Sequence, residues 1–399
     1  MIIKIDKLFR NKFEELLACI LMFFTCLNFN NTYRAFSIIL LVVCLLGFIK
    51  KRQIRVNFFD LFIVVFLLSY YFLDKSINDR NKIVSVITFF IFYIAGKYII
   101  SKYYDNNSEN QISCYLLLSA AAGISIYATL TTFNSDFTIT RICTLFGGTG
   151  TAPATQIAAW EILTISFIPW LIVSRKLISP WLMVGSIIIE IGAIASMFIL
   201  SSRTGLIIIV FAFVWAFFSM VKYKKWRILW LTVGLLVFAI ISYYLNLFGL
   251  KTIIGTSNLV LRLNSSGLSD VRATRHLYVL QNFIKYPNGG LHYNAHFGGQ
   301  IHSMFLDLYD EVGIIPFILF FGLYLSIAIK IYKLIKAKAV SIETIIGISG
   351  FFILNSLQYF MEPVWDYNYP CYLAVLFLFM GVIDMTYMIN SAGTRDNKS

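Results

Sequence analysis

Long runs of apolar residues, separated by short polar segments, make up most of this chain. A helix that crosses a hydrocarbon core about 30 Å thick needs roughly 20 apolar residues. Because helices satisfy their own backbone hydrogen bonds in lipid, such runs predict a helical bundle rather than a barrel. We expect an all-α polytopic membrane protein, one integral membrane domain over residues 1–399, with about twelve transmembrane helices at 13–30, 33–49, 58–73, 83–100, 112–133, 154–173, 181–200, 203–221, 226–248, 312–332, 341–361 and 370–390.

One long polar segment, residues 250–303, interrupts this pattern between the ninth and tenth apolar runs. Within it Leu277, Leu280 and Ile284 recur at helical spacing, which predicts an amphipathic helix over 271–286 that lies at the membrane surface with its basic side available to a ligand. Pro287-Asn288-Gly289-Gly290 predicts a turn that ends this helix. A further helical pattern begins at His302 and runs into the tenth apolar run.

The distribution of charge gives the orientation. The chain is 59% hydrophobic and 13% charged, with a net charge of +13 and a mean hydropathy of +0.76. No small-residue cleavage site follows the basic N-terminus, so we expect a retained first helix that starts in the cytoplasm. Lys and Arg then favour cytoplasmic segments about two to one. Both termini are therefore expected in the cytoplasm and the 250–303 loop outside it. The net charge follows from topology and attraction to membrane lipids, not from a nucleic-acid partner.

The long loop holds all four histidines of the chain together with Arg272 and Arg275. Gathering the proton-transferring side chains on one face of the bilayer predicts that chemistry takes place there. His302 lies near an expected helix N-terminus, where the dipole keeps the ring neutral and able to accept a proton. It is our candidate for a general base or for orienting an acceptor hydroxyl. The alternative is a histidine that caps or packs.

Arg272, Arg275 and His276 fall on one face of the expected helix, at i, i+3 and i+4. Guanidinium groups match phosphate oxygens bidentately, so this face is a candidate for holding a phosphate or diphosphate. The alternative is contact with anionic lipid headgroups.

Arg203 lies in a polar turn between two apolar runs, on the same outer side as the long loop. An arginine near the bilayer centre costs about 2.5–3.5 kcal/mol on insertion scales, so it usually faces a cavity or a partner. We interpret Arg203 as functional, against the alternative of a side chain that extends toward the interface from a helix end.

Acidic residues are the remaining candidates. Glu161 and Glu190 fall inside apolar runs, and Glu362 lies in the last outside loop. Intramembrane carboxylates are functional candidates by default, but these could equally form structural ion pairs with Arg203 or Arg141. The segment Glu362-Pro363-Val364-Trp365-Asp366 combines acidic and aromatic residues, which suits sugar hydroxyls, and both Glu362 and Arg141 are candidates for substrate binding.

A metal site is not expected. His292 and His296 are four residues apart, but they follow a turn, and no cysteine or well-spaced carboxylate completes a ligand set.

Three motifs together resemble those of the O-antigen ligase and polymerase superfamily of bacterial inner membranes. Ser202-Arg203-Thr204-Gly205 is similar to its Ser-Arg-x-Gly motif, and Arg272 followed by a helix and Pro287-Asn288-Gly289-Gly290 is similar to its arginine, helix and proline-glycine segment. His302-Ser303-Met304-Phe305-Leu306, leading to Glu311-Val312-Gly313, is similar to its His-Asn-x-x-Leu and Glu-x-Gly segment. The chain departs from the pattern at Ser303, where asparagine is usual, and at His276, where an aromatic residue is expected.

The resemblance implies a GT-C-like membrane glycosyltransferase whose donor is an undecaprenyl-diphosphate-linked oligosaccharide. In that family pattern Arg203 and Arg272, or Arg275, hold the diphosphate leaving group, and His302 acts on the acceptor, which attacks with inversion. A metal ion, a nucleotide or another cofactor is not implied. A chain-length regulator and a flippase are the implied protein partners.

Within this chemistry we expect a polymerase of repeat units for O-antigen, capsule or exopolysaccharide. The alternative is a ligase that transfers the finished glycan to the core of lipid A, in lipopolysaccharide, or to a protein. From other classes, a lipid-linked oligosaccharide flippase or other transporter would line several helices with charge, and a structural partner in an envelope assembly would not need Arg203 and His302 together.

Overall fold

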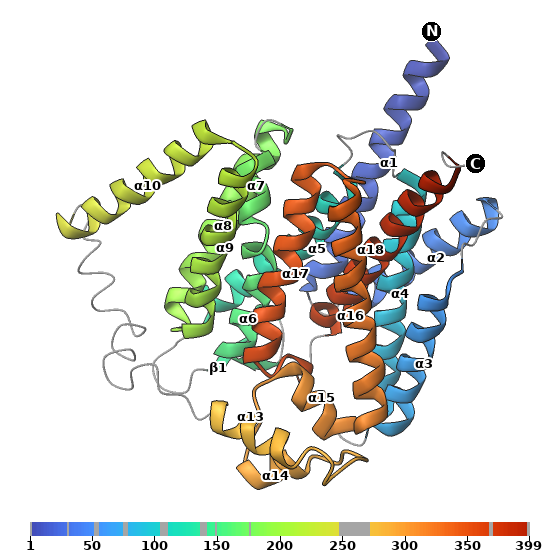
Figure 1. Ribbon diagram of the computed structural model, residues 1–399, viewed down its shortest axis with the longest axis vertical. Helices are drawn as coiled ribbons and strands as arrows, with labels where there is room; N and C mark the ends of the chain where they lie inside the picture. Colours follow the sequence, from blue (N-terminus) through green and yellow to red (C-terminus); the bar gives the residue numbers. More distant parts are fainter. Residues whose placement is uncertain are drawn as a thin grey trace. The chain divides into compact units, whose positions relative to one another are not determined.

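The computed structural model of this chain describes residues 2–29, 32–51, 56–74, 79–103, 111–135, 142–147, 150–174, 177–246, 272–366 and 370–396. Most of them are helical (Figure 1). The helices are α1 (Ile2–Leu27), α2 (Tyr33–Lys51), α3 (Phe58–Leu73), α4 (Asp79–Tyr103), α5 (Ile112–Phe133), α6 (Ala154–Ile165), α7 (Ile168–Ser174), α8 (Pro180–Ile199), α9 (Arg203–Lys222), α10 (Trp226–Tyr244), α13 (Arg272–Gln281), α14 (His292–Phe297), α15 (Met304–Val312), α16 (Ile314–Ala337), α17 (Ile342–Met361), the 3-10 turn η3 (Val364–Asp366) and α18 (Pro370–Asp396). Two strands, β1 (Ile142–Thr144) and β2 (Thr151–Pro153), pair antiparallel, with Cys143 opposite Ala152.

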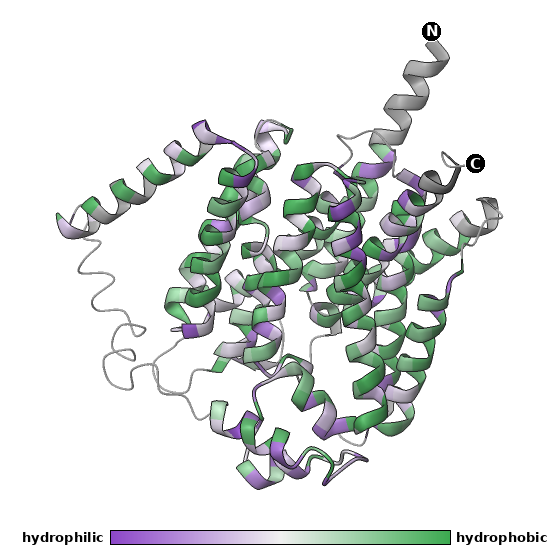
Figure 2. Ribbon diagram, in the orientation of Figure 1, coloured by the Kyte–Doolittle hydropathy of each residue, from purple (hydrophilic) through white to green (hydrophobic). Residues whose placement is uncertain are grey.

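The chain is an all-α polytopic membrane protein. In the described residues, 8 helical segments are long and apolar enough to cross a membrane: Lys82–Tyr103, Ile112–Phe133, Ala154–Ser174, Pro180–Ile199, Arg203–Lys222, Ile314–Ala337, Ile342–Met361 and Cys371–Ser391. A helix lies at each of the expected apolar runs, but the count of about twelve crossings stays a prediction. Figure 2 shows apolar residues over most of α3 and over the first half of α16.

Residue contacts divide the chain into two compact units, each with its own packing. Unit 1 comprises Met1–Ile124, Val271–Ile348 and Tyr359–Ser399, and unit 2 comprises Ser125–Asp270 and Ser349–Gln358. Helices α5 and α17 therefore contribute residues to both units.

In unit 1, α4 and α18 approach closely because glycines face the other helix. A Cβ added at Gly96 would lie 2.5 Å from the carbonyl oxygen of Leu378, and one at Gly381 would lie 2.2 Å from that of Tyr93. Small residues of this kind allow van der Waals packing between helix backbones in lipid, where the hydrophobic effect does not drive helix association.

A network of buried charges ties four helices of unit 1 together. The Asp384 carboxylate of α18 lies 2.6 Å from Lys330 Nζ of α16 and 3.1 Å from Lys97 Nζ of α4. Lys97 also lies 2.6 Å from Asp60 of α3, and Asn57 donates to Asp384 at 2.9 Å. Two lysines and two aspartates thus balance in charge. The sequence analysis did not single out any of these residues.

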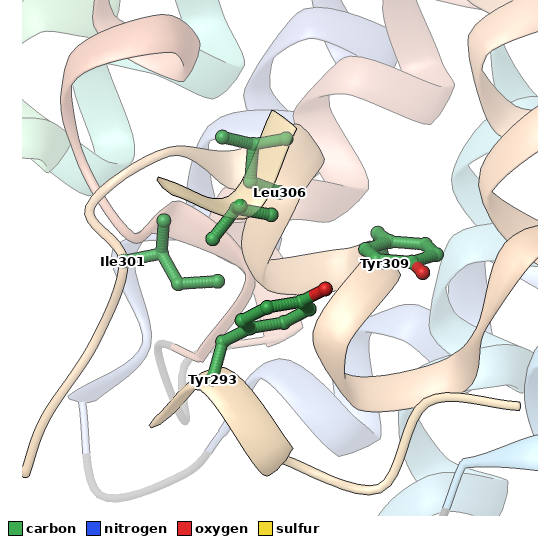
Figure 3. Packing of buried hydrophobic residues seen from close by; sticks show 5 residues of the cluster. Tyr293, Ile301, Leu306 and Tyr309 are labelled. Atoms are coloured by element: carbon green, nitrogen blue, oxygen red, sulfur yellow. The ribbon is translucent and has the colours of Figure 1, made fainter. Parts of the chain in front are cut away.

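Residues 272–313, which we call the cap, form a small folded body at one end of unit 1. In Figure 1, α13, α14 and α15 gather where α16 begins, at the end of this unit opposite the start of α1. The cap has its own apolar centre, which consists of Val279, Tyr293, Ile301, Leu306 and Tyr309. Figure 3 shows the Tyr293 ring beside the α15 residues of this centre.

Candidate functional site

The proline-glycine turn after α13 is locked against the junction of α15 and α16. The Ile314 N–H donates to the Pro287 carbonyl at 2.8 Å, and the Gly290 N–H donates to the Glu311 carbonyl at 3.3 Å. Gly313 has φ +89°, and a Cβ there would lie 2.5 Å from the Pro287 carbonyl oxygen. Only glycine adopts such a conformation at so short a distance without strain. The contact between the turn Pro287-Asn288-Gly289-Gly290 and Gly313 therefore explains structurally why glycines occur in both segments.

This junction corrects the expectation that the helical pattern from His302 runs into the tenth apolar run. The helix α15 ends at Val312, and α16 begins separately at Ile314. The expected surface helix over 271–286 is also shorter, since α13 ends at Gln281.

His302 lies two residues before α15 and has a strained backbone, with φ +70°. Left-handed conformations are uncommon in residues other than glycine, although histidine is among the more tolerant. The Asp307 carboxylate accepts hydrogen bonds from the N–H groups on either side of His302, Ile301 N and Ser303 N, both at 2.9 Å. Asp307 therefore fixes the left-handed backbone conformation of His302.

His276 contacts the same segment from α13. Its Nε2 lies 3.1 Å from the His302 carbonyl oxygen, a distance at which a protonated Nε2 donates a hydrogen bond. The backbone of His302 is thus held at the preceding N–H, at its own carbonyl and at the following N–H. Sequence reasoning placed His276 on a ligand-facing side of the helix, and the structure turns it toward His302.

Arg272 reaches the loop that follows α17. Its Nη1 donates to the Met361 carbonyl at 2.7 Å and to Glu362 Oε1 at 3.0 Å. The next turn, η3, packs against α15, with Trp365 buried against Tyr70 and Phe320 at ring-centroid distances of 5.3 and 5.2 Å. The Trp365 ring is therefore packed in the protein and is not an exposed platform for a sugar. The structure does bring two candidates together here, Arg272 and Glu362.

Arg275 holds the loop between α14 and α15. Its Nη1 donates to the Gln300 carbonyl at 2.5 Å, and its guanidinium carbon lies 5.3 Å from the centre of the Phe297 ring. These contacts distinguish the two loop arginines, because Arg275 bonds within the cap, whereas Arg272 connects the cap to the Glu362 loop.

His292 and His296 each stack on a tyrosine. The His292 ring lies 4.3 Å from the Tyr286 ring, and the His296 ring lies 4.7 Å from the Tyr278 ring. They begin and nearly end the short helix α14, which was not expected. Among the described residues, no group of three or more His, Cys, Asp or Glu side chains could hold a metal ion.

Asp310 fixes the start of α14 in the same way that Asp307 fixes the backbone at His302, by accepting two backbone N–H groups. Its carboxylate accepts the N–H groups of Tyr293 at 2.9 Å and Asn294 at 2.8 Å, at the start of α14. Burial raises the pKa of Asp310, an effect that these two hydrogen bonds offset only in part. Burial also raises the pKa of Tyr293 to about 12, and its hydroxyl donates to the Asn282 carbonyl.

Sequence reasoning missed Asp307 and Asp310 as positioning residues. The signal available was a pair of aspartates three residues apart in a short helix that follows a turn, since carboxylates near a helix N-terminus commonly accept backbone N–H groups. Their partners, however, lie in a preceding loop and in α14, which the sequence alone does not place.

Arg203 belongs to unit 2, where it is the first residue of α9. Ser202 caps that helix, and its Oγ accepts the Gly205 N–H at 3.0 Å. A Cβ at Gly205 would lie 2.3 Å from Met197 Sδ. The serine and the glycine of this motif therefore have structural roles. Arg203, whose side chain is half-buried at the start of α9, remains the candidate of this motif for a functional role.

Arg141 and residues 250–271 of the expected catalytic loop lie outside the described residues.

A comparison with protein-family models gives no match for this chain, and a comparison with curated proteins gives none either.

Proposed function

We propose that this protein polymerises undecaprenyl-diphosphate-linked oligosaccharide repeat units of an O-antigen, capsule or exopolysaccharide. The reaction is glycosyl transfer on the outer face of the bacterial cytoplasmic membrane. The observation that carries the proposal is the construction around His302, whose left-handed backbone is fixed by Asp307 and His276. Strain of about 1–3 kcal/mol persists only where the surroundings over-determine it, and it clusters at active sites.

His302 is the proposed base. The acceptor hydroxyl attacks the anomeric carbon of the donor and passes its proton to the His302 ring. The bond from the anomeric carbon to the diphosphate oxygen breaks, and the diphosphate leaves with the bonding electrons. General-base catalysis of this kind contributes about 10²–10⁴-fold to the rate.

Arg272 is the proposed electrostatic group of unit 1, and Arg203 is the corresponding candidate of unit 2. Fixed cations at a developing negative charge lower the barrier without reorganisation during the reaction. Glu362, 3.0 Å from Arg272 Nη1, orients the guanidinium, and Arg275 and His276 act by holding the cap in shape.

A transporter or flippase is the second candidate, and a specific observation favours it. A flippase is expected to line several helices with charge, and unit 1 has Lys97 and Asp384 buried, with the largely buried Lys330, on three separate helices. Charges inside membrane spans commonly mark transport pathways. Full pairing within the network is, however, also what a structural role requires.

Alanine substitution in the host tests the proposal. We expect Arg272→Ala and Arg203→Ala to reduce the polymer to single repeat units on the outer face, while insertion into the membrane stays normal. Arg227, an exposed arginine of α10, provides the matched control, and its alanine variant should make polymer of normal length. Repeat units trapped on the cytoplasmic face would instead support a flippase, and normal polymer from both test variants would exclude the mechanism.

A further inference from the structure

Unit 2 contains a second polar site, built around a carboxylate inside a membrane-spanning helix. Glu161 of α6 is fully buried. Its carboxylate accepts hydrogen bonds from Ser125 Oγ and, at 2.9 Å, from Thr129 Oγ1, both on α5. Thr164, one turn further along α6, donates from Oγ1 to Ser125 Oγ at 3.1 Å. Two hydroxyl groups therefore bond the Glu161 carboxylate, and a third bonds one of these two.

Glu190 of α8 lies within electrostatic range of Glu161. The helices α6 and α8 pack against each other, and Glu190 is only 7% exposed. Neither of its carboxylate oxygens has a hydrogen-bond partner among the described residues. An unpartnered carboxylate buried to this degree lacks the hydrogen bonds that normally compensate for loss of water.

No cation in the described part of unit 2 pairs with either carboxylate. The other charged or titratable residues of unit 2 on the elements packed around them are Tyr127 of α5, Cys143 of β1, and Arg203 and Lys222 at the two ends of α9, and α5 also carries Cys114 and Tyr115 in its unit 1 part. The ion pairs of the described residues include neither Glu161 nor Glu190. Pairing with Arg203, one of the two alternatives that the sequence left open for these carboxylates, is not among them, and Arg141, the other, lies outside the described residues.

Two ionised carboxylates cannot remain side by side in such a place without compensation. Moving a carboxylate from water to the protein interior costs several kcal/mol even after relaxation, and the two negative charges also repel each other in the low dielectric. One positive charge between them lowers the net buried charge from −2 to −1 and relieves the repulsion between the carboxylates.

We propose that Glu161 and Glu190 form an intramembrane site for one monovalent cation, either a shared proton or Na⁺. The chemistry is common to both ions. A proton bridges the two carboxylates, whereas Na⁺ takes oxygen ligands from the carboxylates and from the hydroxyls of Ser125, Thr129 and Thr164. Such a site would couple unit 2 to the proton or sodium gradient, and it does not depend on glycosyl transfer.

The test uses the purified full-length protein in nanodiscs, with Glu190→Gln and Glu161→Gln as test variants and Glu343→Gln as the matched control. Glu343 lies in the first turn of α17 and belongs to unit 1, whereas Glu161 and Glu190 belong to unit 2. Infrared spectroscopy reports the C=O stretch of a protonated carboxylic acid, and the melting temperature is followed in NaCl and in choline chloride at equal ionic strength. Glutamine keeps the size of the side chain, so the variants are expected to fold.

A carboxylic-acid band in the wild type and in Glu343→Gln, absent from Glu190→Gln, supports the proton. A melting temperature that rises with NaCl and saturates, with no rise in either test variant, supports Na⁺. The proposal is overturned if the wild type has neither signal, or if both test variants keep the signal of the wild type.

Discussion

Mutation can remove the hydrogen bonds that hold the His302 backbone without changing His302 itself. The carboxylates of Asp307 and Asp310 each accept two backbone N–H groups within the cap. Only those bonded to Asp307 flank His302. The two aspartates therefore make a matched pair, alike in stabilising the cap and different in positioning the proposed base.

We expect Asp307→Asn to lower kcat at least tenfold with little change in KM, and Asp310→Asn to leave both nearly unchanged. In each variant one amide oxygen replaces two carboxylate oxygens, so one buried N–H loses its acceptor at a cost of about 1–3 kcal/mol. Steady-state kinetics of repeat-unit transfer, with the melting temperature as a check on folding, measures the difference. Equal kinetic losses in both variants would reduce Asp307 to a purely structural role.

The ionisation of Tyr293 makes the stability of the protein depend on pH at high pH. Burial raises its pKa from 10.0 to about 12. Because the folded pKa lies above that of the unfolded chain, the stability contributed by the neutral hydroxyl is complete below pH 10 and is lost as the pH rises through 12. The tyrosinate absorbance of wild type minus that of Tyr293→Phe should therefore titrate near pH 12. A difference signal with the midpoint of an exposed tyrosine would contradict this packing.

At this scale the sequence identified candidate residues better than their partners. The pairing of Arg272 with Glu362 joins residues 90 positions apart, which no local pattern reveals. Arg275 and His276, predicted to be available to a ligand, contact the carbonyl oxygens of Gln300 and His302, partners that the spacing within α13 does not reveal.

Among the elements, the contact between the proline-glycine turn and the α15–α16 junction controls the shape of the cap. Gly313→Ala should disrupt it, because the added Cβ would lie 2.5 Å from the Pro287 carbonyl oxygen at φ +89°. We expect a loss of at least about 1–3 kcal/mol and faster hydrogen exchange in residues 272–313. Gly322→Ala in α16 is the control: a Cβ there meets nothing within 4 Å, and alanine is a better helix former by about 1 kcal/mol.

Unchanged hydrogen exchange in Gly313→Ala would show that the turn and the junction are independent.

The element boundaries illustrate what hydropathy predicts and what it does not. Apolar runs located the long helices, because lipid selects for length and apolarity over about 20 residues. The break between α15 and α16 at Gly313 depends on a tertiary contact with Pro287, which the run of apolar residues conceals.

In the whole molecule, the buried charges of unit 1 should matter for folding. Asp384→Leu would leave Lys330 and part of the interaction of Lys97 uncompensated, at a cost of about 3–5 kcal/mol. Adding Lys330→Met should recover much of this loss, because it removes the second member of the pair. Unfolding in detergent, monitored by tryptophan fluorescence, measures both variants. An additive or larger loss in the double variant would contradict a structural pairing of Asp384 with Lys330.

How the buried charges of the two units are paired could not be predicted from the sequence. Charge counting along the chain located the loop arginines and histidines. It did not reveal that Lys97, Lys330 and Asp384, which lie on separate apolar helices, meet inside unit 1. Nor did it reveal that Glu190 lacks an ion-pair partner among the described residues. Both depend on how the helices pack, not on spacing within one helix.

The most direct test of the central claim is a reaction with purified components. The full-length protein in nanodiscs is incubated with the lipid-linked repeat unit of its host, without added metal or nucleotide, and the products are separated on a gel and weighed by mass spectrometry. His302→Ala is compared with His292→Ala, a cap histidine that stacks on Tyr286. We predict a ladder of repeat-unit multiples from wild type and His292→Ala and none from His302→Ala. A ladder of equal intensity from His302→Ala, or a wild type that only caps added lipid A core, would contradict the account.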